Sequence, residues 1–171
     1  IVRPGGSTRL IAAASPTAFA LHKLEQLGDD VANLLTNPGF SAEAAAGPQV
    51  EQADDWVSEG APPAWSSWQH PDSSGEFAWD RKVGHDEPGS ARMTGVTTGC
   101  VLQKVSVQAG ERYGVVAWRK LEGDGDASIR ARWQDPDNKW HVPHLDVMID
   151  ASGATGEWVQ MAGTVTVPDG A

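Results

Sequence analysis

Tryptophan and arginine are the residues of this chain whose types and spacing suit a binding chemistry. The chain contains eight tryptophans, against one tyrosine and three phenylalanines. An indole ring stacks on the C–H face of a sugar ring, and the planar guanidinium of arginine donates two parallel hydrogen bonds to vicinal hydroxyls or to a carboxylate. In the stretch ASIRARWQD, Arg130 and Arg132 alternate with apolar residues and so share one face of an expected strand. This combination suits recognition of a carbohydrate; the alternative is a solvated face with one exposed tryptophan.

Further tryptophans lie in segments that we expect to be loops. Trp65 and Trp68 belong to PPAWSSWQHPDSSGEFAW, where prolines, serines and a glycine replace any periodic apolar pattern. Trp140 lies in a second such segment, DPDNKWHVPH. Together these three residues form either a stacking platform at one end of the domain or a cover over the end of its core. We expect Trp79, which leads into the segment of His85, to belong to the core edge.

Signals for catalysis and for metal binding are weak. The sequence contains no Gly-x-Ser-x-Gly elbow, phosphate-binding loop or Cys–His arrangement. The chain has 23 acidic residues, so some pair will lie at the separation used by glycosidases, but nothing singles one out. His141 and His144 lie near Asp146, a spacing that is common by chance. The stretch EGDGDAS lacks the later glycine and glutamate of a calcium loop. We therefore expect no catalytic residue and no metal site.

Length and charge limit the partners. A chain of 171 residues is long enough to bury a core within one domain. Its net charge of −10 arises after residue 35, where ten basic residues face twenty acidic ones, and this charge disfavours nucleic acid and anionic membranes. No apolar run approaches the roughly 20 residues of a membrane span. The lone Cys100 excludes an internal disulfide framework and leaves the compartment undecided.

Most of the chain has the pattern of short β-strands. After residue 34 apolar and polar residues alternate in several segments, with glycine and proline between them, which predicts an all-β fold: a two-sheet β-sandwich jelly roll. Before it, Ser15 and Pro16 suit the start of a helix at about 15–33. We therefore divide the chain into an N-terminal extension (1–33), the tail of an upstream domain or a linker, and a β-domain (34–171).

Five motifs occur in an order that resembles the jelly-roll carbohydrate-binding modules grouped with families four, nine and twenty-two, whose fold is galactose-binding-like. The resemblance covers about residues 33–171. The motifs are NLLTNPGF (33–40), ADDW (53–56), GHDEPGSARMTG (84–95), VLQKVSVQAGERYGVVAWRK (101–120) and EWVQMAGTVTVP (157–168).

The resemblance implies a non-catalytic module that targets a larger bacterial polysaccharide-active protein, such as a glycoside hydrolase, to a polysaccharide or oligosaccharide. The upstream catalytic domain of the same polypeptide would be its partner, outside the cell or at its surface, with the periplasm as an alternative. Ser41 replaces a usual glutamate, and the family's last strand is missing, so we expect a truncated C-terminus. Family calcium sites draw on both places; we expect no cofactor, with a structural calcium ion as the alternative.

The resemblance also implies where sugar would bind. If the Tyr113 face of its strand is core, Trp118 points to the concave face, and Arg130 and Arg132 would join it there as the first candidate site. Trp65, Trp68 and Trp140 form the second. Two rival interpretations remain: an architectural β-sandwich without sugar binding in a multidomain extracellular protein, and a small hydrolase or lyase on the same fold.

Overall fold

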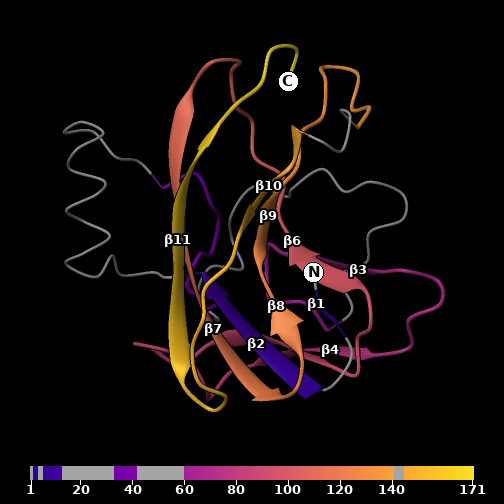
Figure 1. Cartoon of the computed structure of the whole chain (residues 1–171), viewed down its shortest axis with the longest axis vertical. Helices are drawn as coiled ribbons and strands as arrows, with labels where there is room; N and C mark the ends of the chain where they lie inside the picture. The colour runs from indigo at the N-terminus through magenta and orange to yellow at the C-terminus, as the bar shows by residue number, and fades with distance from the viewer. Residues whose placement is uncertain (1, 4–5, 13–32, 42–59, 141–144) are drawn as a thin grey trace.

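The computed structural model describes residues 2–3, 6–12, 33–41, 60–140 and 145–171. Within these ranges the chain forms antiparallel β-structure without an α-helix, as predicted for an all-β fold (Figure 1). The strands are β1 (Val2–Arg3), β2 (Gly6–Ala12), β3 (Ser66–Gln69), β4 (Glu76–Asp80), β5 (Ser90–Thr94), β6 (Gly99–Leu102), β7 (Arg112–Gly123), β8 (Asp126–Ala127), β9 (Ile129–Ala131), β10 (Val147–Ile149) and β11 (Trp158–Thr166).

The largest sheet has five strands in the order β11-β7-β2-β5-β4. Its longest ladder joins β11 to β7, from Trp158 opposite Lys120 to Thr166 opposite Arg112. A turn precedes β7: Gly110 has φ of 82°, which favours glycine, and its N–H donates to Val167 O at 2.9 Å.

The centre of this sheet is occupied by a strand that the sequence analysis did not predict. β2 pairs with β7 on one side and with β5 on the other, both antiparallel. It comes from the segment that was interpreted as an extension ahead of the β-domain. The helix predicted at about 15–33 falls almost wholly on residues 13–32, outside the described residues.

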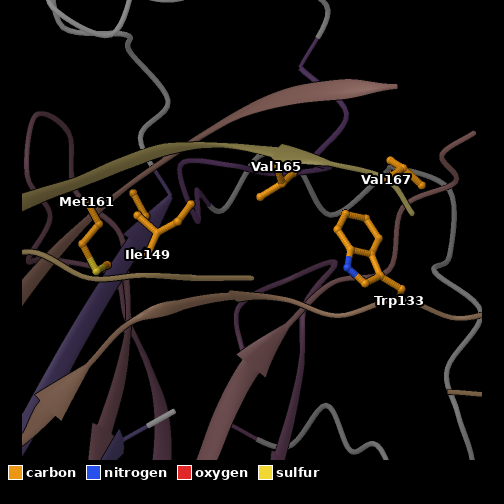
Figure 2. Packing of buried hydrophobic residues seen from close by; sticks show 6 residues of the cluster. Trp133, Ile149, Met161, Val165 and Val167 are labelled. Atoms are coloured by element: carbon orange, nitrogen blue, oxygen red, sulfur yellow. The ribbon is translucent and has the colours of Figure 1, made fainter. Parts of the chain in front are cut away.

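The main hydrophobic core lies between the β7–β11 pair and the β9–β10 pair. Met161 and Val165 of β11 face Ile149 of β10 and Trp133, which follows β9 (Figure 2). Met161 is completely buried and Trp133 is 6% exposed. The core thus contains Ile129, Ala131 and Trp133, the apolar residues that alternate with Arg130 and Arg132.

The same core confirms the predicted face of β7. Tyr113, Val115 and Ala117 pack in it. Because side chains alternate along a strand, Trp118 must project to the other side of the sheet. A second cluster continues the core beside β5: Met93 and the neighbouring Val96 and Ala127 are buried together, with Phe77, Val101 and Leu121 against them.

The segment 33–41 is fixed to the domain by Asn37, which is 5% exposed and has φ of 52°. Its Nδ2 donates to Ser41 O and Pro63 O, at 3.1 and 2.9 Å, and its Oδ1 accepts from Ser41 N at 2.7 Å. Ser41, which stands where the resembling family has glutamate, thus completes a local turn through its backbone. The asparagine of NPGF is therefore a structural residue.

Phe40 of the same segment is held by two tryptophans. Its ring is 2% exposed and lies 4.8 Å from the ring of Trp65, centroid to centroid. Trp65 Nε1 donates to Asn37 O at 3.0 Å, and Trp79 Nε1 donates to Phe40 O at 2.8 Å. Both indole N–H groups are therefore used inside the domain, which gives Trp65 and Trp79 a structural role.

Candidate functional site

Arg130 and Arg132 project away from the main core. Ile129, Ala131 and Trp133 point into it, and the two arginines alternate with them. β9 is paired with β10, so Met148, opposite Arg130, lies on the same outward face and is 53% exposed. The sequence prediction that the two arginines share one face is confirmed.

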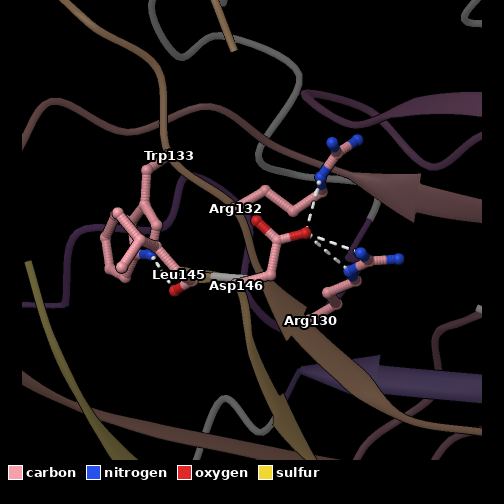
Figure 3. A network of polar contacts seen from close by, with 5 residues as sticks. All are labelled: Arg130, Arg132, Trp133, Leu145 and Asp146. Carbon is pink, nitrogen blue, oxygen red and sulfur yellow. Dashed lines mark hydrogen bonds and ion pairs between the residues drawn. The ribbon is translucent and has the colours of Figure 1, made fainter. Parts of the chain in front are cut away.

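A single carboxylate joins the two guanidinium groups. Asp146 Oδ2 accepts from Arg130 Nε at 3.0 Å, from Arg130 Nη2 at 2.6 Å and from Arg132 Nε at 3.1 Å (Figure 3). The Asp146 side chain is only 5% exposed, whereas those of Arg130 and Arg132 are 28% and 39% exposed. Two cations share one anion, so this spot carries one excess positive charge in a chain whose net charge is −10.

The core fixes the position of this carboxylate. Trp133 Nε1 donates to Leu145 O at 2.9 Å, so a buried indole holds the backbone immediately before Asp146 (Figure 3). β10 begins at the next residue, Val147, which pairs with Ala131. Asp146 is thus placed by a core hydrogen bond on one side and by a strand ladder on the other, and it in turn orients both arginines.

Trp140 extends the site into solvent. It is 47% exposed, and the Cζ of Arg132 lies 4.4 Å from the centroid of its ring, within the range of a cation–π interaction. A β-bridge to Gln134 and a tight turn locate it: Asp135 Oδ1 accepts from the backbone N–H of Asp137 and of Lys139, at 3.0 and 2.8 Å. The turn therefore returns the chain to the arginines.

The guanidinium of Arg132 retains an open edge. Its Nε is bonded to Asp146 and its face covers Trp140, but within the described ranges its two terminal nitrogens donate no hydrogen bond. Figure 3 shows them pointing away from Asp146. We call Arg130, Arg132, Asp146 and Trp140 the arginine–tryptophan face. It presents an oriented fork of N–H donors beside a partly exposed indole.

Trp68 lies on a neighbouring strand pair, β3–β6, opposite Cys100. Val101 packs in the core, so Cys100 and Trp68 project from the other side of this pair. Burial raises the pKa of the Cys100 thiol, while the positive charges of Arg132 and Arg130 act in the opposite direction. Trp68 and Cys100 therefore lie on the same side of the β3–β6 pair.

Trp118 does not join the arginines. The face of β7 that carries Ala117 packs against the β9–β10 pair, so Trp118 and the two arginines project to opposite sides of the main core. The prediction that Trp118, Arg130 and Arg132 share a concave face is therefore wrong. Its premise was that β7 and β9 are neighbours in one sheet, whereas they face each other across the core.

The ring of Trp118 is instead part of an internal aromatic cluster. It stacks on His85, with ring centroids 3.7 Å apart and an interplanar angle of 15°, and His85 meets Trp158 edge to face at 6.1 Å. Trp65, Trp118 and Trp158 all pack against the buried Phe40 and Ala91. Of the loop tryptophans proposed as a platform, Trp65 therefore covers the core, whereas Trp140 is 47% exposed.

Sequence reasoning missed Asp146 as the residue that organises the site. It is 16 residues from Arg130 and 14 from Arg132, and no motif links them. The available signal was the apolar alternation of 129–133 and 147–149, which is that of two antiparallel strands whose flanking residues meet.

The described residues can be searched for a metal site and for a membrane-spanning helix. Among its residues, no group of three or more His, Cys, Asp or Glu side chains is arranged to hold a metal ion. His141 and His144 lie outside the described residues. In the same part of the chain, no helix is long and apolar enough to cross a membrane.

Comparison with protein-family models, with curated proteins and with solved structures found no match to this chain. The resemblance to carbohydrate-binding modules therefore stays a prediction from the motifs.

Proposed function

We propose that this chain is a non-catalytic carbohydrate-binding domain that brings a larger polysaccharide-active protein to its glycan, outside the cell or at its surface. The observation that supports this function is the arginine–tryptophan face, where an exposed indole lies beside two guanidiniums oriented by one buried carboxylate. A β-sandwich jelly roll is the fold we propose for it, since antiparallel strand pairs face each other across a common core.

The chemistry of sugar binding matches these groups. Trp140 supplies an apolar surface for the C–H face of a pyranose, and the outward N–H groups of Arg132 donate to its hydroxyls. Asp146 and Trp140 already hold the guanidinium in place, so little side-chain freedom is lost on binding. A site of this size supports weak affinity, which is useful when the domain raises the local concentration of an attached partner on a polymer.

The same face is poorly suited to hydrolysis. A glycosidase of the common type needs two carboxyl groups on opposite sides of the scissile bond. Among the described residues, the carboxylate that the two arginines share is that of Asp146, which is buried, and one of its oxygens accepts three hydrogen bonds from guanidinium groups. Its role is to position the arginines, which favours binding over catalysis.

Affinity gel electrophoresis against a panel of soluble polysaccharides tests this function. At least one glycan should retard the protein, and Trp140→Ala should abolish the retardation. The matched control is Arg81→Ala, because Arg81 lies over the ring of Trp79 at 4.2 Å in a similar pair elsewhere on the domain. If no glycan in a broad panel retards the protein, the architectural interpretation replaces the proposed function. Release of reducing ends or of unsaturated products would indicate an enzyme instead.

A further inference from the structure

The arginine–tryptophan face has a charge that a site for neutral sugars does not require. Arg130 and Arg132 share Asp146, which leaves one uncompensated positive charge. Both arginines are partly exposed and the carboxylate is not, so the positive groups are the ones that meet solvent. Within a chain of net charge −10, this local excess lies beside the exposed ring of Trp140.

The geometry of Arg132 further restricts which ligand groups the site can bind. Three parts of its guanidinium are distinguishable: the Nε edge is bonded to Asp146, one face lies on Trp140, and the terminal edge is open among the described residues. Two terminal N–H groups of a planar guanidinium match the two oxygens of a carboxylate, which accept both in parallel. Two vicinal hydroxyls can accept from the same edge, but they offer it no negative charge.

From these observations we infer that the site selects sugars that carry a carboxylate, namely the uronic acid residues of acidic polysaccharides, and that Arg132 determines this specificity. The inference rests on the proposed function and names its ligand class. The uronate carboxylate pairs with the terminal edge of Arg132 while a pyranose ring of the same chain stacks on Trp140. Asp146 is then the positioning residue, because it holds Arg132 without contacting the sugar.

The expected selectivity follows from the kind of hydrogen bond. A charge-assisted bond is roughly twice as strong as a neutral one, and a bidentate pair forms two of them. The site is open to solvent, which weakens the attraction. We therefore expect a carboxylate form of a glycan to bind about tenfold more tightly than the same glycan with the charge removed.

Isothermal titration calorimetry with matched oligosaccharides tests the inference. The probes are oligogalacturonates with free carboxylates, the same oligomers fully methyl-esterified, glucuronate-substituted xylo-oligosaccharides, unsubstituted xylo-oligosaccharides and a sulfated galactan oligomer. Free carboxylates on at least one backbone should increase affinity about tenfold over the neutral partner. Arg132→Lys, which keeps the charge and loses the fork, and Arg132→Gln should each remove that increase.

Controls separate this result from a failure of folding or of the proposed function. Arg81→Gln changes a similar arginine–tryptophan pair and should leave the selectivity intact. The urea midpoint of each variant shows whether it is folded. If neutral oligomers bind through Trp140 with equal or higher affinity than the acidic ones, the inference is overturned and the proposed function stands. Binding of the sulfated oligomer alone also overturns it. If no probe binds although a polysaccharide of the affinity-gel panel retards the protein, the inference is overturned and the proposed function stands; if no polysaccharide of that panel retards it either, both fail.

Discussion

Replacement of Asp146 by asparagine removes the charge on which the arginine–tryptophan face depends while preserving the size of the side chain. In the native protein one carboxylate oxygen accepts three hydrogen bonds from two guanidiniums, and the side chain is 5% exposed. The asparagine amide has one acceptor oxygen and one NH₂ group in place of the two carboxylate oxygens. If the oxygen faces the arginines, it accepts without a negative charge; if the NH₂ group faces them, donor meets donor. At least part of the network is therefore lost, and two positive groups are left side by side.

The size of the stability loss in Asp146→Asn depends on how far Asp146, Arg130 and Arg132 are buried. A hydrogen bond to a charged group contributes about 1.5–3 kcal/mol to stability. Arg130 and Arg132 are 28% and 39% exposed, so water replaces part of what they lose, and the three bonds do not add. We expect Asp146→Asn to lower the free energy of unfolding by about 2–3 kcal/mol, which is less than the about 3–5 kcal/mol for breaking a fully buried pair.

Urea unfolding followed by tryptophan fluorescence measures this loss. With a slope of about 2 kcal/mol per M, the midpoint should fall by about 1–1.5 M. Asp137→Asn is the matched control, because Asp137 lies 3.9 Å from Lys139 and both side chains are largely exposed. Such a pair contributes less than about 1 kcal/mol. If the two variants lose equal stability, Asp146 does not organise the site and the reasoning is refuted.

Three further predictions concern other parts of the domain. Asn37→Ala removes four side-chain hydrogen bonds at a φ of 52° and should cost about 3 kcal/mol in urea unfolding. Asn37→Gly, which tolerates that φ, should cost about 1 kcal/mol less, and equal losses would show that backbone strain is unimportant there. The hydrogen bond to Glu111 raises the pKa of Tyr113, so absorbance at 295 nm, which reports the single tyrosine, should titrate at lower pH in Glu111→Gln, and an unchanged titration would contradict this. Burial raises the pKa of Cys100, so iodoacetamide should modify this thiol more slowly at pH 8 in the folded protein than in the urea-unfolded chain. Because the folded-state pKa is the higher one, the stability that the protonated thiol contributes is complete below the pKa of the unfolded thiol, about 8.5, and is lost as the pH rises through the folded-state value. Equal modification rates in the two states would refute the shift.

Local alternation predicted the parts of the fold that depend on one strand at a time. The apolar face of 129–133 was assigned correctly because it buries every second side chain, and this period of two is visible in the sequence. The outward direction of Arg130 and Arg132 follows from the same pattern. That the segment of β11 forms a β-strand was predictable for the same reason. Both faces of β7 carry apolar residues, and its core face was expected from the family resemblance.

Relations between strands were not predictable in this way. Whether Trp118 meets Arg130 depends on whether β7 and β9 are hydrogen-bonded neighbours or face each other across the core, and alternation is the same in both arrangements. The central place of β2 had no signal either, because a strand far from its partners in sequence is identified only by its pairing. Asp146 was missed because its partners follow from the β9–β10 register.

Tryptophan burial was also decided by distant partners. Trp65 and Trp140 both lie in segments rich in turn-forming residues, and their local sequences do not distinguish them. Trp65 is internal because the segment 37–40 supplies a ring to pack against and a carbonyl for its N–H. Trp140 has an arginine on its ring and nearly half of its surface exposed.

The most direct test of the central claim is an NMR titration that follows the indole N–H signals of the eight tryptophans. On addition of the glycan with the highest affinity in gel electrophoresis, the signal assigned to Trp140 through Trp140→Ala should shift in a saturable manner. The signals of Trp79 and Trp133, whose N–H groups bond to backbone carbonyls inside the domain, should remain in place. A glycan that shifts other indole signals and leaves Trp140 unchanged, or the absence of any shift with every glycan tested, would contradict binding at the arginine–tryptophan face.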